Sequence, residues 1–436
     1  MSSATPGRQE VPDSPSMWRS IVTVAGGTGI AQLVPLIVFP LVARHYGPEA
    51  LYDYLLFLAI TAPLTILLGF RVDMAVLSAH DERSMRAILA FGLVGVAGLG
   101  LVVSGVSLLV HATSIESWPV ARLFPASPVC AAFIALNLVL IAAGTFRRRY
   151  RAIAVAQVLP ATLAAMGQVA CVALRLSAEW LIYTYIVSQL LTFLGLFCWL
   201  VVVGDVPLRA LVTREAYPTD RDDWRAITRF GVFSTPADLI NSLASLAPLA
   251  LLGGLRGGRE DAAAFGVVQR YAGAPLAFVT RSMSLVFRGE AAAELRHSGH
   301  CMTSFMRILR GLGLIALGAT VIGEVALHLI VPAVLGPAWD ATIPVFALVL
   351  PLMMLRGVGA TLSLVMLLRQ QQLTDLVLQF IFLVISVGPF LVFDTARAAL
   401  VGFVLGGAIF QVVAIVLYAR VAGLRADYSR VTGLGG

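Results

Sequence analysis

Four arginines stand inside long apolar stretches of this sequence, where a charged side chain is expensive. They are Arg71, Arg270, Arg281 and Arg356. A charge at the centre of a bilayer costs at least ~3 kcal/mol, so such a residue usually faces the protein interior or a water-filled cavity. A guanidinium group also pairs well with phosphate and carboxylate oxygens. These arginines are therefore candidate binding residues for an anionic ligand within a membrane.

Depth separates the four arginines into two pairs. Arg270 lies about eight residues into its apolar run and Arg356 about fifteen, which is roughly 12 Å and 22 Å at 1.5 Å per residue. Arg71 and Arg281 lie nearer the ends of their runs, where a long side chain can reach the membrane surface. We predict that Arg270 and Arg356 line a cavity.

Three acidic residues share the same apolar stretches, namely Asp73, Asp238 and Glu324. Asp73 is two residues from Arg71, which favours a local ion pair. Glu324 is followed one helical turn later by His328. Two interpretations of these acids stay open: each can carry a coupling proton or sodium ion, or each can pair with a buried arginine.

Other patterns that carry chemistry are missing from the sequence. There is no Gly-rich phosphate loop, no Ser/His/Asp arrangement and no Cys/His cluster. The four cysteines lack the spacing of metal or redox sites, and two histidines in a charged loop are a weak signal. We expect no metal and no cofactor. Because the basic residues lie mainly in loops between apolar runs, we also expect no nucleic acid partner.

Composition places the chain in a membrane. Apolar residues make up 59% of the 436 residues and charged residues 13%, whereas soluble domains are about 25% charged. In a bilayer each apolar run must satisfy its own backbone hydrogen bonds, so it forms a helix. We predict an all-α polytopic membrane protein with twelve transmembrane helices, at residues 20–43, 52–78, 87–110, 126–146, 152–174, 180–203, 230–253, 262–286, 305–332, 341–368, 373–393 and 398–419.

The arginines also predict the orientation of these helices. All of the basic charge apart from histidine is arginine, and most of it falls in alternate loops if the N-terminus lies inside. Loops rich in Arg and Lys stay in the cytoplasm. We therefore predict a multi-pass protein of a cell membrane with both termini in the cytoplasm.

The chain divides into two similar halves. Leu33-Val34-Pro35-Leu36 resembles Leu246-Ala247-Pro248-Leu249, and Ala62-Pro63-Leu64 matches Ala274-Pro275-Leu276 at nearly the same spacing. Six spans per half give parallel repeats, a common plan for transporters with a site between the halves. The predicted parts are a tail (1–19), an N-lobe (20–203), a cytoplasmic linker (204–229), a C-lobe (230–420) and a second tail (421–436).

Several segments resemble a known family. They are Gln32-Leu33-Val34-Pro35-Leu36, Tyr46-Gly47-Pro48-Glu49, Gly69-Phe70-Arg71-Val72-Asp73-Met74-Ala75, Gly266-Val267-Val268-Gln269-Arg270 and Leu335-Gly336-Pro337-Ala338-Trp339. Together they are similar to the polysaccharide-transport, or oligosaccharide flippase, family. That family belongs to the superfamily that also holds the multidrug and toxin extrusion transporters. Asp73 departs from the family, where a glutamate is expected.

The resemblance implies a flippase of a bacterial inner membrane. Such a protein moves undecaprenyl-diphosphate-linked oligosaccharide from the inner to the outer leaflet for O-antigen, capsule or exopolysaccharide synthesis. Polysaccharide polymerases and glycosyltransferases would be its partners. Arg270 and Arg356 would bind the diphosphate, Arg281 and Arg71 would guide the lipid in, and rocking of the two lobes would carry it across.

Two other functions fit the same features. A cation-coupled antiporter that exports small drugs or metabolites shares the expected fold, and its buried acids would matter more than its arginines. A membrane glycosyltransferase or polymerase usually needs a sizeable outer loop with several charged residues. The longest predicted outer loop, 111–125, holds one acid and one arginine. This short loop argues against an enzyme.

Overall fold

The computed structural model of the chain describes residues 14–112, 126–147, 149–202, 218, 220–369 and 371–424. Within these residues the chain is helical and contains no strand. The N-terminal half holds α1 (Ser14–Gly69), α2 (Val72–Leu77), α3 (Glu82–Ala112), α4 (Ala126–Phe146), α5 (Tyr150–Ala173) and α6 (Glu179–Val202). The rest holds α8 (Arg221–Arg229), η3 (Phe230–Ser234), α9 (Thr235–Gly254), α10 (Gly258–Ser298), α11 (Met302–Ile330), η4 (Val331–Leu335), η5 (Pro337–Thr342), α12 (Ile343–Leu362), α13 (Leu364–Leu368), α14 (Gln372–Val392) and α15 (Ala396–Gly423).

The predicted all-α membrane fold is confirmed. Ten helical segments among the described residues are long and apolar enough to cross a bilayer. The first of them, Gly29–Gly69, holds parts of two predicted spans, because Gly47 has φ 74° and ψ 174° and breaks α1 in two. A glycine suits this left-handed turn because it has no Cβ. The predicted eighth span lies in α10, which carries more charge than the ten segments.

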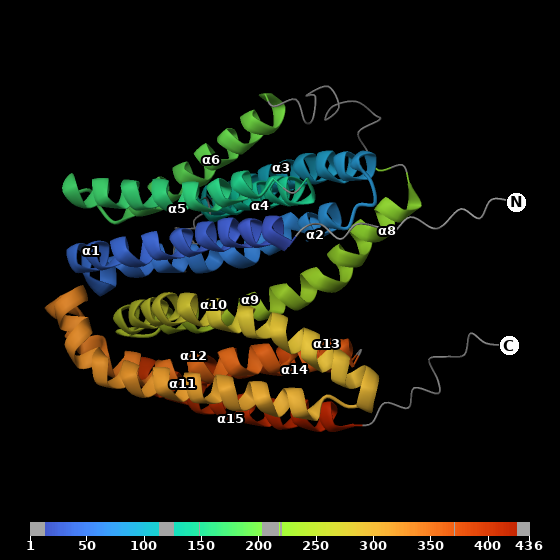
Figure 1. Cartoon of the computed structure of the whole chain (residues 1–436). Helices are drawn as coiled ribbons and strands as arrows, with labels where there is room; N and C mark the ends of the chain where they lie inside the picture. Colours follow the sequence, from blue (N-terminus) through green and yellow to red (C-terminus); the bar gives the residue numbers. More distant parts are fainter. Residues whose placement is uncertain are drawn as a thin grey trace, which may run out of the picture.

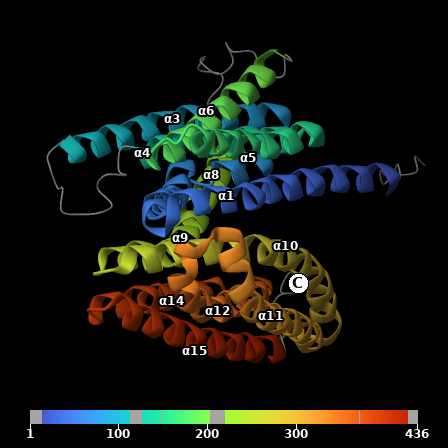
Figure 2. The same ribbon diagram turned by 90° about the vertical axis from the view of Figure 1, so that its left-hand side faces the viewer.

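The helices form two lobes. In Figure 1, α1 to α6 make the upper layer and α9 to α15 the lower one, and the view along the bundle in Figure 2 shows the same division. The short helix α8 leads from the upper lobe towards α9. The first and last described residues lie at the same end of the bundle, which we call the terminal end. The opposite end, with the loops near Gly47 and Leu255, is the far end.

Three hydrophobic cores show where the lobes are joined. One core combines residues of both lobes, such as Phe39 and Tyr52 with Phe265 and Trp339, and lies towards the far end. A second core is built from α1 to α4 with a few residues of α6 and α8, and a third from α10 to α15. These last two lie towards the terminal end and do not share residues. The lobes are therefore packed together at the far end and have separate cores at the terminal end.

Trp339 is the largest side chain that closes the far end. It is completely buried and stacks on Phe346, with ring centroids 6.4 Å apart. Its indole N–H donates a 2.9 Å hydrogen bond to the carbonyl oxygen of Ala43 in the other lobe. Nearby, Arg259 of α10 pairs with Asp53 of α1 at 2.7 Å. Apolar packing and polar contacts both cross between the lobes here.

A carboxylate fixes the hairpin between α10 and α11 at the terminal end. The two oxygens of Glu294 accept hydrogen bonds from the backbone N–H groups of Thr303 at 3.0 Å and Ser304 at 2.8 Å. These are unpaired donors at the start of α11, where a negative charge also suits the helix dipole. Burial alone would raise the pKa of Glu294, but the hydrogen bonds from Ser304 and Thr303 outweigh it and lower the pKa to about 2.

We expect Trp339→Ala to destabilise the protein. Replacing a buried Trp by Ala typically costs about 3–5 kcal/mol, and this change also leaves the carbonyl of Ala43 without its donor. The thermal unfolding temperature of the purified protein should fall by several degrees. Trp180→Ala, at a side chain that is 49% exposed, should leave it nearly unchanged. Equal unfolding temperatures for the two variants would contradict a packed far end.

The low pKa of Glu294 predicts a pH dependence of stability. A carboxyl whose pKa is about 2 in the folded state and ordinarily 4.5 stabilises the fold above pH ~4.5 and loses that effect as the pH falls towards 2. Glu294→Gln should lower the unfolding temperature at pH 7 and flatten its fall between pH 5 and pH 3. Glu49→Gln, at an exposed position, serves as the control. If the unfolding temperature of Glu294→Gln fell between pH 5 and pH 3 as steeply as that of the wild type, the stabilising role of the Glu294 carboxylate would be contradicted.

Candidate functional site

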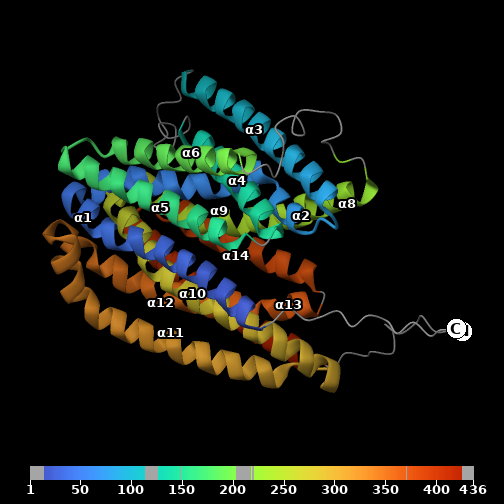
Figure 3. The ribbon, with the colours of Figure 1, turned by 45° about the horizontal axis from the view of Figure 1, so that its top comes forward.

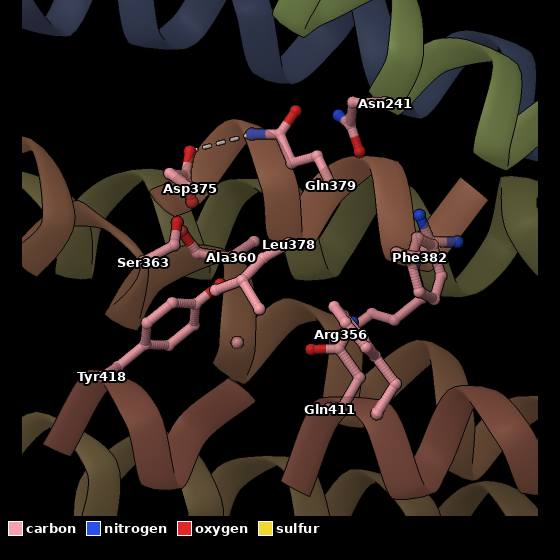
Figure 4. A pocket seen from close by; sticks show the side chains of 12 residues that line it. Asn241, Arg356, Ala360, Ser363, Asp375, Leu378, Gln379, Phe382, Gln411 and Tyr418 are labelled. Carbon is pink, nitrogen blue, oxygen red and sulfur yellow. Dashed lines mark hydrogen bonds between the residues drawn. The ribbon is translucent and has the colours of Figure 1, made fainter. Parts of the chain in front are cut away.

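The C-lobe holds a polar cavity, and Arg356 lies on its wall. Its volume is about 260 Å³, and its lining comes from α9, α12, α14, α15 and the residue after α12. Figure 4 shows the side chains of this Arg356 cavity. Besides Arg356, its polar lining residues are Asn241, Ser363, Asp375, Gln379, Gln411 and Tyr418. One guanidinium, one carboxylate, three amides and two hydroxyls therefore meet within an otherwise apolar lobe.

The guanidinium of Arg356 is held by an aromatic ring and a hydroxyl. Its central carbon lies 4.7 Å from the centre of the Phe382 ring, a cation–π distance. Its Nη2 donates a 3.1 Å hydrogen bond to Oγ of Ser245. Among the described residues no carboxylate forms an ion pair with it. A guanidinium has five N–H donors, so Arg356 keeps donors for an anionic or hydroxyl-rich ligand.

Asp375 and Gln379 belong to this cavity although the sequence reasoning above did not single them out. Gln379 donates a 2.9 Å hydrogen bond from Nε2 to Asp375, and its own Oε1 is buried without a partner. Gln411 lies across from them, where the absence of a Cβ at Gly359 makes room for its amide oxygen. A polar pair four residues apart within the apolar run 373–393 was the signal that could have found them.

Arg270 lies in a different place, at the seam between the lobes. It extends from α10 to α1, where its central carbon lies 4.8 Å from the centre of the Phe39 ring. On the same seam, the hydroxyl of Tyr54 in α1 accepts a 2.7 Å hydrogen bond from Gln168 of α5. Figure 3 shows α1 and α10 running along this seam. Arg270 packs against the ring of Phe39. That it lines a cavity remains a prediction.

Arg71 joins the lobes near the terminal end. Its Nε donates a 2.6 Å hydrogen bond to Asp238 of α9, and its Nη2 pairs with the same carboxylate oxygen. Asp73 is the second partner, at 3.9 Å. Both acids thus contact an arginine, although a role in ion coupling stays a prediction. We call Arg71 and Asp238 the terminal-end ion pair.

The backbone that presents Arg71 is unusual. Phe70 and Arg71 have φ values of 44° and 52°, a left-handed region that costs free energy for residues with bulky side chains. This turn ends α1 and directs both side chains to the C-lobe segment. The ring of Phe70 packs so closely on Gly231 that any Cβ at residue 231 would collide with it. Strain at the turn is thus offset by contacts between the lobes.

The remaining predicted site residues lie apart from the cavity. Glu324 is on α11 among side chains that face outwards, such as Ile322 and Val325, and one of its carboxyl oxygens is buried without a partner. Arg281 is in α10, but its side chain lies outside the described part of the structure. The described residues contain no group of three or more His, Cys, Asp or Glu side chains that could hold a metal ion.

Solved structures show what this fold is similar to. An inward-facing multidrug resistance MATE family transporter of the MOP superfamily matches with a TM-score of 0.68 at 17% identity, over 96% of this chain and 100% of the other. An outward-facing transporter of the same description gives 0.58 at 18% identity, over 96% and 97%. A MOP superfamily transporter from Pyrococcus furiosus, described as having a binding pocket of reverse polarity that suggests a different function, gives 0.61 at 16% identity, over 94% and 97%.

These likenesses establish the fold. No protein-family model and no curated protein matches the sequence. The chain therefore has the two-lobed helical fold of MATE transporters of the MOP superfamily.

We expect the terminal-end ion pair to limit access between the lobes. In Asp238→Ala, Arg71 keeps only the more distant Asp73, so the lobes should separate more readily. A cysteine placed at Asn241, in a protein whose native cysteines are replaced, should react several-fold faster with a membrane-impermeant maleimide added from the terminal side. The swapped variant Arg71→Asp with Asp238→Arg should restore the slower rate.

The control for this measurement is Arg225→Ala. Arg225 pairs at 3.0 Å with Asp222 in the same short helix, so its loss should not alter the labelling of residue 241. Equal rates in wild type and Asp238→Ala would show that the ion pair does not hold the lobes.

Proposed function

We propose that this chain is an exporter that works by alternating access between its two lobes. The observation that carries the proposal is the distribution of the cores: one core joins the lobes at the far end, and two separate cores stand at the terminal end. The TM-score is higher against an inward-facing transporter than against an outward-facing one, which supports a conformation in which the lobes are closed at the far end. The arginine distribution supports a cytoplasmic location for the terminal end.

In this conformation the far-end contacts hold the lobes together over a shared core, while the terminal-end ion pair is a smaller contact that can break and form again during the cycle. The lobes rock about the seam, so that closing the terminal end requires opening the contacts of Trp339 and Arg259. The Arg356 cavity then becomes accessible from the other side. The rocking of parallel repeats is a common transport mechanism for folds of this kind.

Two classes of cargo have support. A small organic molecule, a drug or metabolite, is supported by the multidrug resistance transporters that share the fold. In that case Asp375, Asp238, Asp73 or Glu324 would couple export to protons or sodium ions. This is the cargo that the structural likenesses favour.

The second class is a lipid-linked oligosaccharide, and the chemistry of the Arg356 cavity supports it. Diphosphate oxygens match a guanidinium without a carboxylate partner, and amides and hydroxyls match sugar hydroxyls. Each sugar hydroxyl costs several kcal/mol in hydrocarbon, so a polar route through the bundle is required. This flippase would work in a bacterial inner membrane, beside a polysaccharide polymerase and glycosyltransferases.

Arg356 should be required for transport of either cargo. A hydrogen bond to a charged group is worth about 1.5–3 kcal/mol, so Arg356→Ala should reduce transport at least roughly tenfold with unchanged protein level. Arg356→Lys should recover part of it, because it keeps the charge but loses the planar fork. The measurement is transport in proteoliposomes, with Arg225→Ala as the control. Full transport by Arg356→Ala would refute the site.

Deletion of the gene tells the two cargoes apart. Build-up of a lipid-linked oligosaccharide on the inner leaflet would identify a flippase. Increased sensitivity to small toxic compounds without that build-up would identify a drug or metabolite exporter. Normal surface polysaccharide together with normal drug sensitivity would contradict both.

A further inference from the structure

An apolar groove runs along the membrane-facing side of the C-lobe, opposite the Arg356 cavity. It lies between α10, α11 and α12 and has a volume of about 630 Å³, within the range of ligand pockets. Tyr271 is its one described lining residue with a polar side-chain atom, and that hydroxyl is already engaged with the carbonyl of Leu36 at 3.2 Å. We call it the C-lobe groove.

The length of the C-lobe groove is unusual. On α11 its lining extends from Leu312 to Ile330, which is roughly 27 Å at 1.5 Å per residue, and it continues into η4. The hydrocarbon core of a bilayer is about 30 Å thick. An acyl chain of a phospholipid covers about half of that thickness, so no single acyl chain fills the groove.

The C-lobe groove is open to the membrane along one side. Its outer wall on α11 includes Ile322, which is 70% exposed, and Ile330, which is 53% exposed. Ala319 on the same wall is small and leaves room in the groove, and the missing Cβ of Gly323 lets α11 approach Leu350 of α12 closely. A hydrocarbon chain can therefore enter sideways from the bilayer without passing through the bundle.

The groove and the polar site are placed on opposite faces of the same helix. On α12, Leu350, Met354 and Val358 line the groove at intervals of four residues, whereas Arg356 faces the cavity. On α10, Tyr271 lines the groove and its neighbour Arg270 faces the seam with α1. Apolar and cationic surfaces thus lie one helix diameter apart, as a ligand with a charged head and a long apolar tail requires.

We propose that the C-lobe groove holds the polyisoprenoid chain of a diphosphate-linked lipid cargo while its head occupies the Arg356 cavity on the other face of α12. This inference rests on the second cargo class of the proposed function. A groove that spans both leaflets keeps the chain in an apolar environment as the head moves from one side to the other. The hydroxyl of Tyr271, bonded across the seam to α1, marks where head and tail would separate.

The N-lobe supplies a matched control. A second apolar groove, with a volume of about 520 Å³, lies between α3, α4 and α6. Its lining on α3 extends from Ala90 to Ser104, which is only about 21 Å, and its lining residues all belong to the N-lobe. We expect this N-lobe groove to take ordinary membrane lipid.

The test compares two probes that differ in chain length alone, undecaprenyl diphosphate and farnesyl diphosphate. Binding to the full-length purified protein in nanodiscs is measured by native mass spectrometry. The long chain can make van der Waals contacts along the whole groove and the farnesyl chain along only part of it, so the wild type should bind undecaprenyl diphosphate at least tenfold more tightly. Ala319→Phe should remove this preference by filling the C-lobe groove. Ala97→Phe, at an exposed alanine of the N-lobe groove, should keep it.

A second pair of variants covers the case in which Ala319→Phe does not fold. Ile322→Gln places a polar amide on the wall of the C-lobe groove, and Leu101→Gln does the same in the N-lobe groove, where Leu101 is 76% exposed. Only Ile322→Gln should weaken binding of the long chain.

The outcomes distinguish a failure of the groove inference from a failure of the proposed transport function. Equal binding of both probes to the wild type, or an equal loss in both groove variants, would overturn the inference, while export that depends on Arg356 would leave the proposed function intact. No binding of either diphosphate, with Arg356-dependent export of small molecules, would reject the groove's role and the lipid cargo together.

Discussion

A guanidinium group inside a membrane bundle must find groups that replace its lost water, and this constraint shapes the interior of the protein. Of the four arginines in the predicted spans, Arg71, Arg270 and Arg356 have described side chains, and each satisfies this constraint in a different way. Arg71 pairs with carboxylates, Arg270 packs on the ring of Phe39, and Arg356 combines the ring of Phe382 with a hydrogen bond to Ser245. Arg356 is the one of these three that also lines a described cavity. This difference makes Arg356 the best candidate for ligand binding and the other two candidates for joining the lobes.

Charged side chains that lie between the lobes are also paired, at both ends of the bundle. At the far end, apolar packing around Trp339 is reinforced by the pair of Arg259 and Asp53. At the terminal end the cores are separate, and the ion pair of Arg71 and Asp238 bridges the lobes beside the strained turn at Phe70. An ion pair can exchange protein partners for water more readily than a large apolar interface can. An apolar interface at the far end and an ion pair at the terminal end therefore suit a transporter that opens at the terminal end.

The sequence predicted the helices well because hydrocarbon leaves the backbone so few choices. Within the described residues the twelve apolar runs lie almost entirely on helices, and even the kinked α1 was divided correctly into two spans near Gly47. The local relation of Arg71 and Asp73 was also foreseen. The two-lobed fold followed from the repeated proline segments and is confirmed by the structure and its similarity to MATE transporters.

The site was less predictable because it depends on contacts between distant residues. Nothing in the chain indicated which acid would meet Arg71, and Asp238 lies 167 residues away. Asp375, Gln379 and Gln411 gather around one cavity only through the packing of α14 on α9 and α15, and of α15 on α12. The apolar grooves were equally hidden, since their lining residues look like any other membrane-facing positions. Pattern and composition give the elements, whereas cavities arise from how the elements pack.

The most direct test of the account is a pair of distance measurements between the lobes in proteoliposomes. Spin labels at His80 and His297 would report on the terminal end, and labels at Arg175 and Arg256 on the far end, in protein whose native cysteines are replaced. Pulsed electron paramagnetic resonance spectroscopy at varied proton and sodium concentrations should show the terminal-end and far-end distances changing in opposite directions. Distances that stay fixed, or that lengthen and shorten together at both ends, would contradict alternating access by rocking lobes.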